Sequence, residues 1–90
     1  MLFQAQKLKV LQIEKCQLLE LNESFAIEDL RVMHLVECDL SDISSHSLKV
    51  FKAAKDSLRS VNLSKNRITT IPDILFDHCP YIVKLLLAQN

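Results

Sequence analysis

The 90-residue chain contains no glycine and no tryptophan, and only two prolines. Average proteins contain about 7% glycine. A chain without glycine cannot build the glycine-rich loops that hold phosphate groups or dinucleotides. The chain also lacks a run of about 18 apolar residues, the length at which a transmembrane helix is considered. We therefore expect neither a nucleotide-binding loop nor a membrane partner.

An excess of charge of one sign is also missing. Eleven Lys and Arg residues balance eleven Asp and Glu residues, so the formal net charge is zero. Because nucleic acids are bound mainly through an excess of basic residues, we expect no nucleic-acid partner. The hydrophobic fraction of 49% is too high for intrinsic disorder, and 90 residues allow at most one domain.

The three cysteines, Cys16, Cys38 and Cys79, form an odd and widely spaced set without a CxxC pair. Such a set is a poor disulfide framework, so reduced thiols and an intracellular location, cytoplasmic or nuclear, are predicted. Two Asn-x-Ser sequences, at Asn22 and Asn62, would be glycosylated only in a secreted protein. The first residues do not have the pattern of a signal peptide.

Four segments of the chain share the apolar pattern LxxLxLxxN/CxL. They begin at Leu8, Leu30, Leu58 and Ile82, so that successive starts are 22, 28 and 24 residues apart. All fifteen positions that the pattern requires to be apolar are apolar, with the fourth segment ending before its last position. In the first segment, apolar Leu11 and Ile13 alternate with polar Gln12 and Glu14. This period of two residues indicates a strand with one buried face.

Over nearly the whole chain, these segments resemble the repeats of the leucine-rich repeat family. The resemblance implies an α/β solenoid segment, with about four short parallel strands on the concave face and one helix and helical turns on the convex side. Each repeat would bury its apolar side against its neighbours. Residues 1–90 are expected to form a single segment that is incomplete at its C-terminal end. Three alternatives stay open: a fragment continued by further repeats of the same full-length protein, a truncated gene product, and a module completed by another chain.

The longer connections predict the helical parts. Residues 44–57 are expected to contain a helix with Leu48 and Phe51 directed inward. Pro72 is expected near the start of a second helical turn, in which Ile71 and Phe76 pack inward.

The ninth position of each repeat is predicted to form a structural ladder. The chain must turn after each strand, and an Asn side chain can donate and accept hydrogen bonds to the backbone groups left inside. A thiol is small and apolar enough to pack there. The ladder residues would be Cys16, Cys38, Asn66 and Asn90, with both cysteines inside the core. A disulfide between the two cysteines is not expected because their side chains would point the same way.

No set of residues has the pattern of a catalytic or metal site. His34, His46 and His78 are expected to lie apart, and a zinc site would need four clustered ligands. We predict that the chain is not an enzyme and binds no cofactor.

The exposed face of the predicted sheet is the remaining candidate site. Val10, Val32, Val36 and Leu86 are apolar where solvent is expected, and such a cluster marks a partner site unless its members are merely single exposed residues. The candidate partner-binding residues are Val10, Gln12, Glu14, Val32, His34, Val36, Ser60, Asn62, Ser64, Lys84 and Leu86.

The predicted function is a non-catalytic protein-protein interaction module, as an intracellular scaffold or adaptor. Within the family, the order of a Cys-type repeat, one long repeat and SLRSVNLSKNRITTIP resembles a nuclear substrate receptor of cullin-RING ubiquitin ligases. Two alternatives stay open: a fragment of an extracellular leucine-rich repeat receptor ectodomain, and a purely structural repeat piece.

Overall fold

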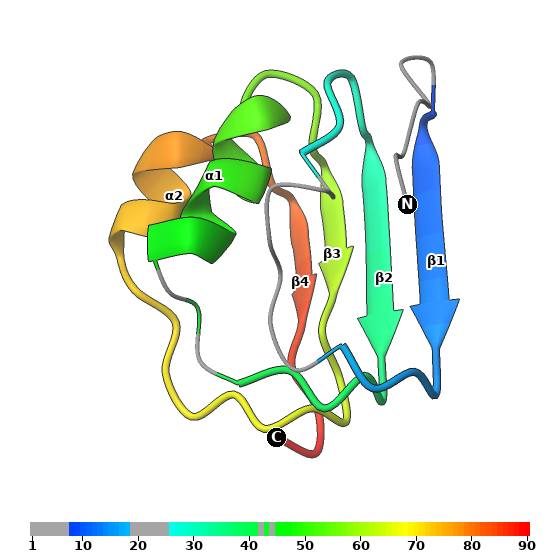
Figure 1. The fold of residues 1–90 in the computed structure, drawn as a ribbon. Coiled ribbons are helices and arrows are strands. Elements are labelled where there is room, and N and C mark those ends of the chain that lie inside the picture. Colours follow the sequence, from blue (N-terminus) through cyan, green and yellow to red (C-terminus); the bar gives the residue numbers. More distant parts are fainter. Residues whose placement is uncertain (1–7, 19–25, 42, 44) are drawn as a thin grey trace.

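Four short parallel strands lie side by side in one sheet. The computed structural model describes residues 8–18, 26–41, 43 and 45–90. The strands are β1 (Val10–Glu14), β2 (Val32–Val36), β3 (Ser60–Asn62) and β4 (Lys84–Leu86). They follow one another across the sheet in chain order, and all run in the same direction (Figure 1). The four predicted parallel strands are confirmed.

Equivalent positions of the four repeats are paired across the sheet. Val10 pairs with Val32, Val32 with Ser60, and Ser60 with Lys84. Backbone hydrogen bonds continue this register past the strand ends, because the Lys15 N–H donates to the carbonyl of Val36 at 3.1 Å. The repeat in the sequence is therefore also a repeat in space.

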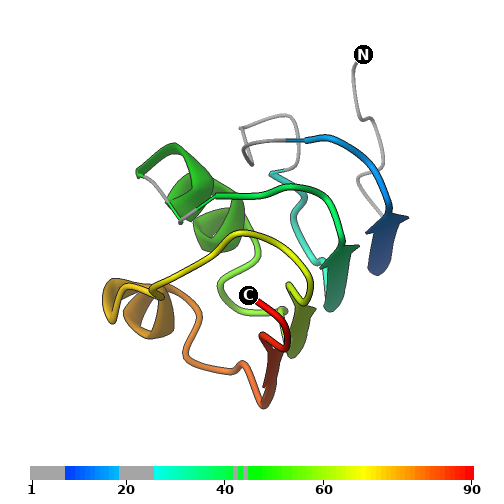
Figure 2. The same cartoon turned by 90° about the horizontal axis from the view of Figure 1, so that it is seen from below.

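Both helices lie on one side of the sheet, as Figure 2 shows. Helix α1 spans Ser45–Ala53 and lies within the predicted residues 44–57. After α1 the chain forms a turn, in which the Ser57 N–H donates to the carbonyl of Ala54 at 3.1 Å. Helix α2 spans Ile74–His78 and starts just after Pro72, whose carbonyl accepts the Leu75 N–H at 3.0 Å.

The hydrophobic core fills the space between the sheet and the helices. The strands contribute Met33, Leu35 and Val61, and the helices contribute Phe51 and Leu75, all with 0% exposure. Ile71 and Leu48, which were expected to face inward, are partly buried against this core.

The prediction that Phe76 packs inward was wrong, because its side chain is 46% exposed. Helix α2 has only five residues, so it turns a narrow face toward the core. Leu75 occupies that face and is fully buried. Phe76, one residue later, is rotated by about 100° around the helix axis and reaches solvent.

Cys79 lies in the same core at the end of α2. Its thiol donates a hydrogen bond to the Phe51 carbonyl at 3.0 Å and thereby links α2 to α1. Burial raises the pKa of the Cys79 thiol from its ordinary value of 9.0 to about 11. The thiol is therefore held in its neutral form.

Cys79 should make stability depend on pH in the alkaline range. The unfolded chain loses this proton near pH 9 and the folded chain only near pH 11, so the unfolded state is the more deprotonated between these values. The contribution of Cys79 to the free energy of unfolding is complete below pH 9, and it falls by up to about 2–3 kcal/mol as the pH rises to 11. Urea unfolding in reducing buffer at about pH 8 and pH 10.5 should show a smaller pH-dependent loss for Cys79→Ala than for the wild type. Equal losses in both proteins would contradict this role.

Candidate protein-binding face

The sheet face that points away from the helices carries three rows of side chains. The first row is Val10, Val32, Ser60 and Lys84, and the second is Gln12, His34, Asn62 and Leu86. The third contains Glu14 and Val36, followed by Ser64, whose carbonyl accepts the Glu37 N–H at 3.1 Å. The residues between these rows, such as Met33 and Val61, are buried toward the helices. All the candidate partner-binding residues thus lie on one face.

The centre of this face is less accessible than its edges. Val32, His34 and Val36 on β2 are half-buried. On the outer strands, Val10 is 50% exposed and Leu86 is 38% exposed. A partner that contacts β2 would therefore complete the burial of side chains that are already partly packed.

The four apolar residues of the face do not form the single cluster that was expected. Val10 and Val32 are paired neighbours in the first row. Val36 lies at the other end of β2, about 13 Å along the strand from Val32. Leu86 lies on β4, with β3 between it and β2. The face therefore presents one apolar pair and two separate apolar residues, set among polar side chains.

The middle row is polar at its centre. His34 lies between Gln12 and Asn62. The Asn62 side-chain oxygen accepts the Ser64 N–H at 3.1 Å, which fixes the orientation of this amide. Imidazole and amide groups can both donate and accept hydrogen bonds, so this row can recognise the polar groups of a peptide.

Asn66 connects two neighbouring repeats beneath the ends of the strands. Its side chain is buried and makes five hydrogen bonds. The amide NH₂ donates to the carbonyls of Leu35 (2.7 Å), Leu63 (2.9 Å) and Ser64 (3.2 Å), and the amide oxygen accepts the N–H groups of Cys38 (2.9 Å) and Leu40 (3.1 Å). The Asn66 amide thus both donates and accepts hydrogen bonds at the ninth position of its repeat.

Cys38 and Asn90 repeat this arrangement in the repeats on either side. The Cys38 thiol donates to the carbonyls of Ile13 at 3.5 Å and Val36 at 3.4 Å, and burial raises its pKa. The Asn90 NH₂ donates to the carbonyls of Leu63 and Leu87, and its oxygen accepts the Ile68 N–H at 2.9 Å. Each of these side chains thus bonds its own repeat and the repeat before it.

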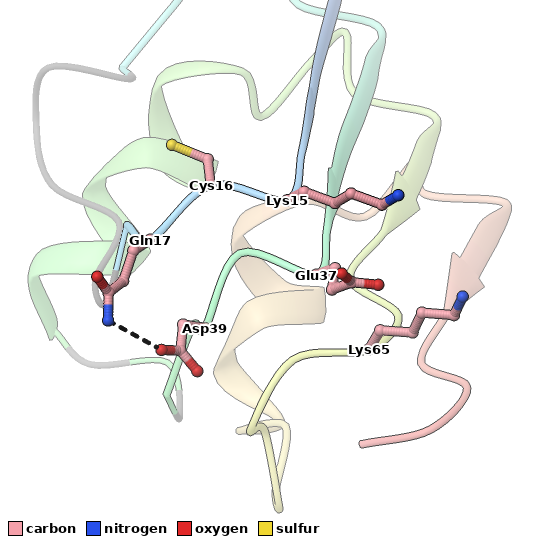
Figure 3. Close-up of a pocket in the computed structure, with 6 residues that line it drawn as sticks. All are labelled: Lys15, Cys16, Gln17, Glu37, Asp39 and Lys65. Carbon is pink, nitrogen blue, oxygen red and sulfur yellow. Dashed lines mark hydrogen bonds between the residues drawn. The ribbon is translucent and has the colours of Figure 1, made fainter.

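The prediction that Cys16 lies inside the core was wrong, because its side chain is exposed. Cys16 follows β1, which is at one edge of the sheet, so in the described part of the chain its ladder position has a neighbouring repeat on one side only. It lines a shallow depression of about 330 Å³ together with Lys15, Gln17, Glu37, Asp39 and Lys65 (Figure 3). There the Gln17 side chain donates to Asp39 at 3.5 Å. Cys16 is therefore the accessible thiol of the three.

A left-handed backbone turn follows every strand, which the sequence did not reveal. It occurs at the eighth position of each repeat, at Lys15 (φ 54°), Glu37 (φ 57°), Lys65 (φ 58°) and Gln89 (φ 59°). This conformation costs a non-glycine residue about 1–2 kcal/mol. Glycine usually marks such turns, and this chain has none. The available signal in the sequence was that each of the four repeats has a long polar residue at this position.

Lys65→Gly is expected to raise the free energy of unfolding by about 0.5–1 kcal/mol, because relief of the left-handed strain exceeds the extra entropy of the unfolded glycine chain. Urea unfolding followed by circular dichroism measures the change. The control is Lys52→Gly, which removes the same side chain from an exposed position of α1. The free energy of unfolding of Lys52→Gly should fall by about 1 kcal/mol, because glycine is a poor helix former. A loss of stability in both variants would contradict the strained turn.

A family model described as Leucine Rich Repeat matches residues 57–79. This segment contains β3, Asn66 and α2. The match supports the leucine-rich repeat family, whose repeats generally act as non-catalytic modules that bind other proteins. No curated protein and no solved structure matches the chain.

The described part of the chain holds no group of three or more His, Cys, Asp or Glu residues that could bind a metal ion. Its helices are too short or too polar to cross a membrane.

Proposed function

We propose that the chain is a non-catalytic binding module whose partner protein docks on the sheet face away from the helices. The observation that carries this proposal is the register of the strands, which brings equivalent residues of four repeats into three rows on one open face. Solenoid repeat proteins commonly bind along such a face, and we propose that the chain is a segment of a solenoid. The half-buried β2 residues Val32, His34 and Val36 would form the centre of the contact.

We further propose that the module works inside the cell as a scaffold or adaptor. Cys16, Cys38 and Cys79 are all free, which suits a reducing compartment. A glycan on Asn62 would cover the middle row of the sheet face, which argues against an extracellular role that uses this face. More specifically, we propose that the adaptor is part of a substrate receptor of a ubiquitin ligase and holds the substrate on the sheet face.

The test uses a photo-crosslinking amino acid at His34, on the sheet face, and at Lys52, on the exposed side of α1. We expect the His34 probe to capture a partner that the Lys52 probe does not capture. Binding of that purified partner should then weaken at least about tenfold with Val36→Glu and change less than about twofold with Lys52→Glu. Circular-dichroism melts of both variants would verify that each one folds.

Two results would contradict the proposal. One is selective capture by the Lys52 probe. The other is wild-type affinity of the folded Val36→Glu variant for the captured partner.

A further inference from the structure

A row of cations lies along the edge of the sheet at which the strands begin. The strands begin at the upper end of the sheet in Figure 1. Lys9 directly precedes β1, Arg31 precedes β2 and Arg59 precedes β3. Backbone bonds hold the three in register, since the Arg31 N–H donates to the Lys9 carbonyl at 2.8 Å and the Arg59 N–H to the Arg31 carbonyl at 2.9 Å. Neighbouring strands are about 4.8 Å apart, so the three backbone positions span about 10 Å.

Two of these cations are exposed and the third is held in place. Lys9 and Arg31 are exposed, whereas Arg59 is half-buried. The Arg59 Nη1 donates to the carbonyls of Asp56 at 3.1 Å and Leu58 at 3.5 Å, and its guanidinium carbon lies 5.0 Å from the centre of the Tyr81 ring. These contacts fix the planar guanidinium group before any partner arrives, which lowers the entropy cost of binding.

The row ends on an apolar surface. Val83 is its fourth member, because the Val83 N–H donates to the Arg59 carbonyl at 2.8 Å. Val83 is 83% exposed, and Tyr81 is 51% exposed beside Arg59. Exposed tyrosine and arginine side chains are enriched where proteins bind one another. We name these five residues, Lys9, Arg31, Arg59, Tyr81 and Val83, the strand-start strip.

Nearby carboxylates define what the strand-start strip can accept. Glu28, Asp29 and Asp56 lie in the loops that lead into β2 and β3 and are exposed. They would repel a long polyanion such as a nucleic acid, and the chain as a whole has no positive charge in excess. A short protein segment with only a few carboxylates carries less negative charge and meets less of this repulsion. Alternate residues of an extended segment are about 6.8 Å apart, which long Lys and Arg side chains about 4.8 Å apart can match.

We propose that the strand-start strip binds an extended acidic segment of a partner protein. Carboxylates on alternate residues of that segment pair with Lys9, Arg31 and Arg59, and an apolar or aromatic residue after them packs on Tyr81 and Val83. This surface shares no residue with the sheet face, so the proposal does not depend on the proposed function.

The test uses a fluorescein-labelled nonapeptide with Glu on alternate residues and a Phe-Leu end, titrated by fluorescence anisotropy at about 50 mM salt. The double variant Lys9→Glu/Arg31→Glu should weaken binding at least about tenfold, since both side chains are exposed and ion pairing is lost. Tyr81→Ala should weaken it about threefold or more. The matched control Lys15→Glu/Lys65→Glu makes the same charge change at the opposite edge and should alter binding less than about twofold.

Four results would overturn the proposal: no binding of the peptide up to about 1 mM, equal binding of a peptide with Gln in place of Glu, an equal loss in the control variant, or tighter binding of a single-stranded oligonucleotide of the same charge. The last result would assign the strand-start strip to nucleic acid. The variant Val36→Glu should bind the peptide as the wild type does, which separates this test from that of the sheet face.

Discussion

Replacing Asn66 with alanine is expected to lower the free energy of unfolding by about 3–5 kcal/mol. The substitution removes five hydrogen bonds and leaves the N–H groups of Cys38 and Leu40 without their acceptor inside the protein. Each buried polar group that loses its partner costs about 1–3 kcal/mol. The expected loss is smaller than the sum of these costs, because water can enter and bond the unpaired groups once the amide is gone. Urea unfolding followed by circular dichroism measures the loss.

Two asparagines of the same chain serve as controls for Asn66→Ala. Asn62→Ala removes one side-chain bond from a half-buried site and should cost less than about 1 kcal/mol. Asn90→Ala changes the ladder position of the last repeat, which is exposed, and should have an intermediate effect. If Asn66→Ala cost no more than Asn62→Ala, the ladder would not hold the repeats together.

Phe51→Ala is also expected to lower the free energy of unfolding, by about 3–5 kcal/mol. Phe51 lies on the inner side of α1 with 0% exposure, so truncation opens a cavity between α1 and the sheet. The matched control is Phe76→Ala on α2, where the side chain is 46% exposed and the loss should stay below about 1 kcal/mol. Thermal or urea unfolding compares the two variants. Equal losses would show that α1 does not cover the sheet as described.

The strands and the ladder could be predicted because they depend on patterns that repeat four times. Alternation of apolar and other residues fixed which side of each strand is buried, as at Met33 and Leu35. Asn66 was predicted from the need of a buried turn for a group that both donates and accepts. Such features depend on position within the repeat and not on the detail of any one loop.

The errors arose where a residue's place in the whole molecule overrides the repeat. Cys16 has the same repeat position as Cys38, but it lies at the edge of the sheet and is exposed. The exposure of Phe76 depends on where the five-residue helix α2 starts. If the helix were shifted by one residue, Phe76 and not Leu75 would take the buried position. Helix phase over so short a length cannot be obtained from apolar periodicity.

Part of the strand-start strip has a common position in the repeat pattern. Aligning the repeats places Lys9, Arg31, Arg59 and Val83 at the same second position. That alignment becomes a surface only when the strands are known to pair in register, as the backbone bonds between these residues show. The contact of Tyr81 with Arg59 joins the loop before β4 to the residue before β3, and no spacing in the sequence indicates it.

The parallel stacking of equivalent residues can be tested most directly by nuclear Overhauser measurements on isotope-labelled protein. The side-chain NH₂ protons of Asn66 should exchange slowly and show cross-peaks to the amide protons of Cys38 and Leu40. Amide protons of β3 should likewise show contacts with β2 at the register of His34 and Asn62. A rapidly exchanging Asn66 side chain without these cross-peaks would contradict the stacking, and with it the shared face on which the proposed binding depends.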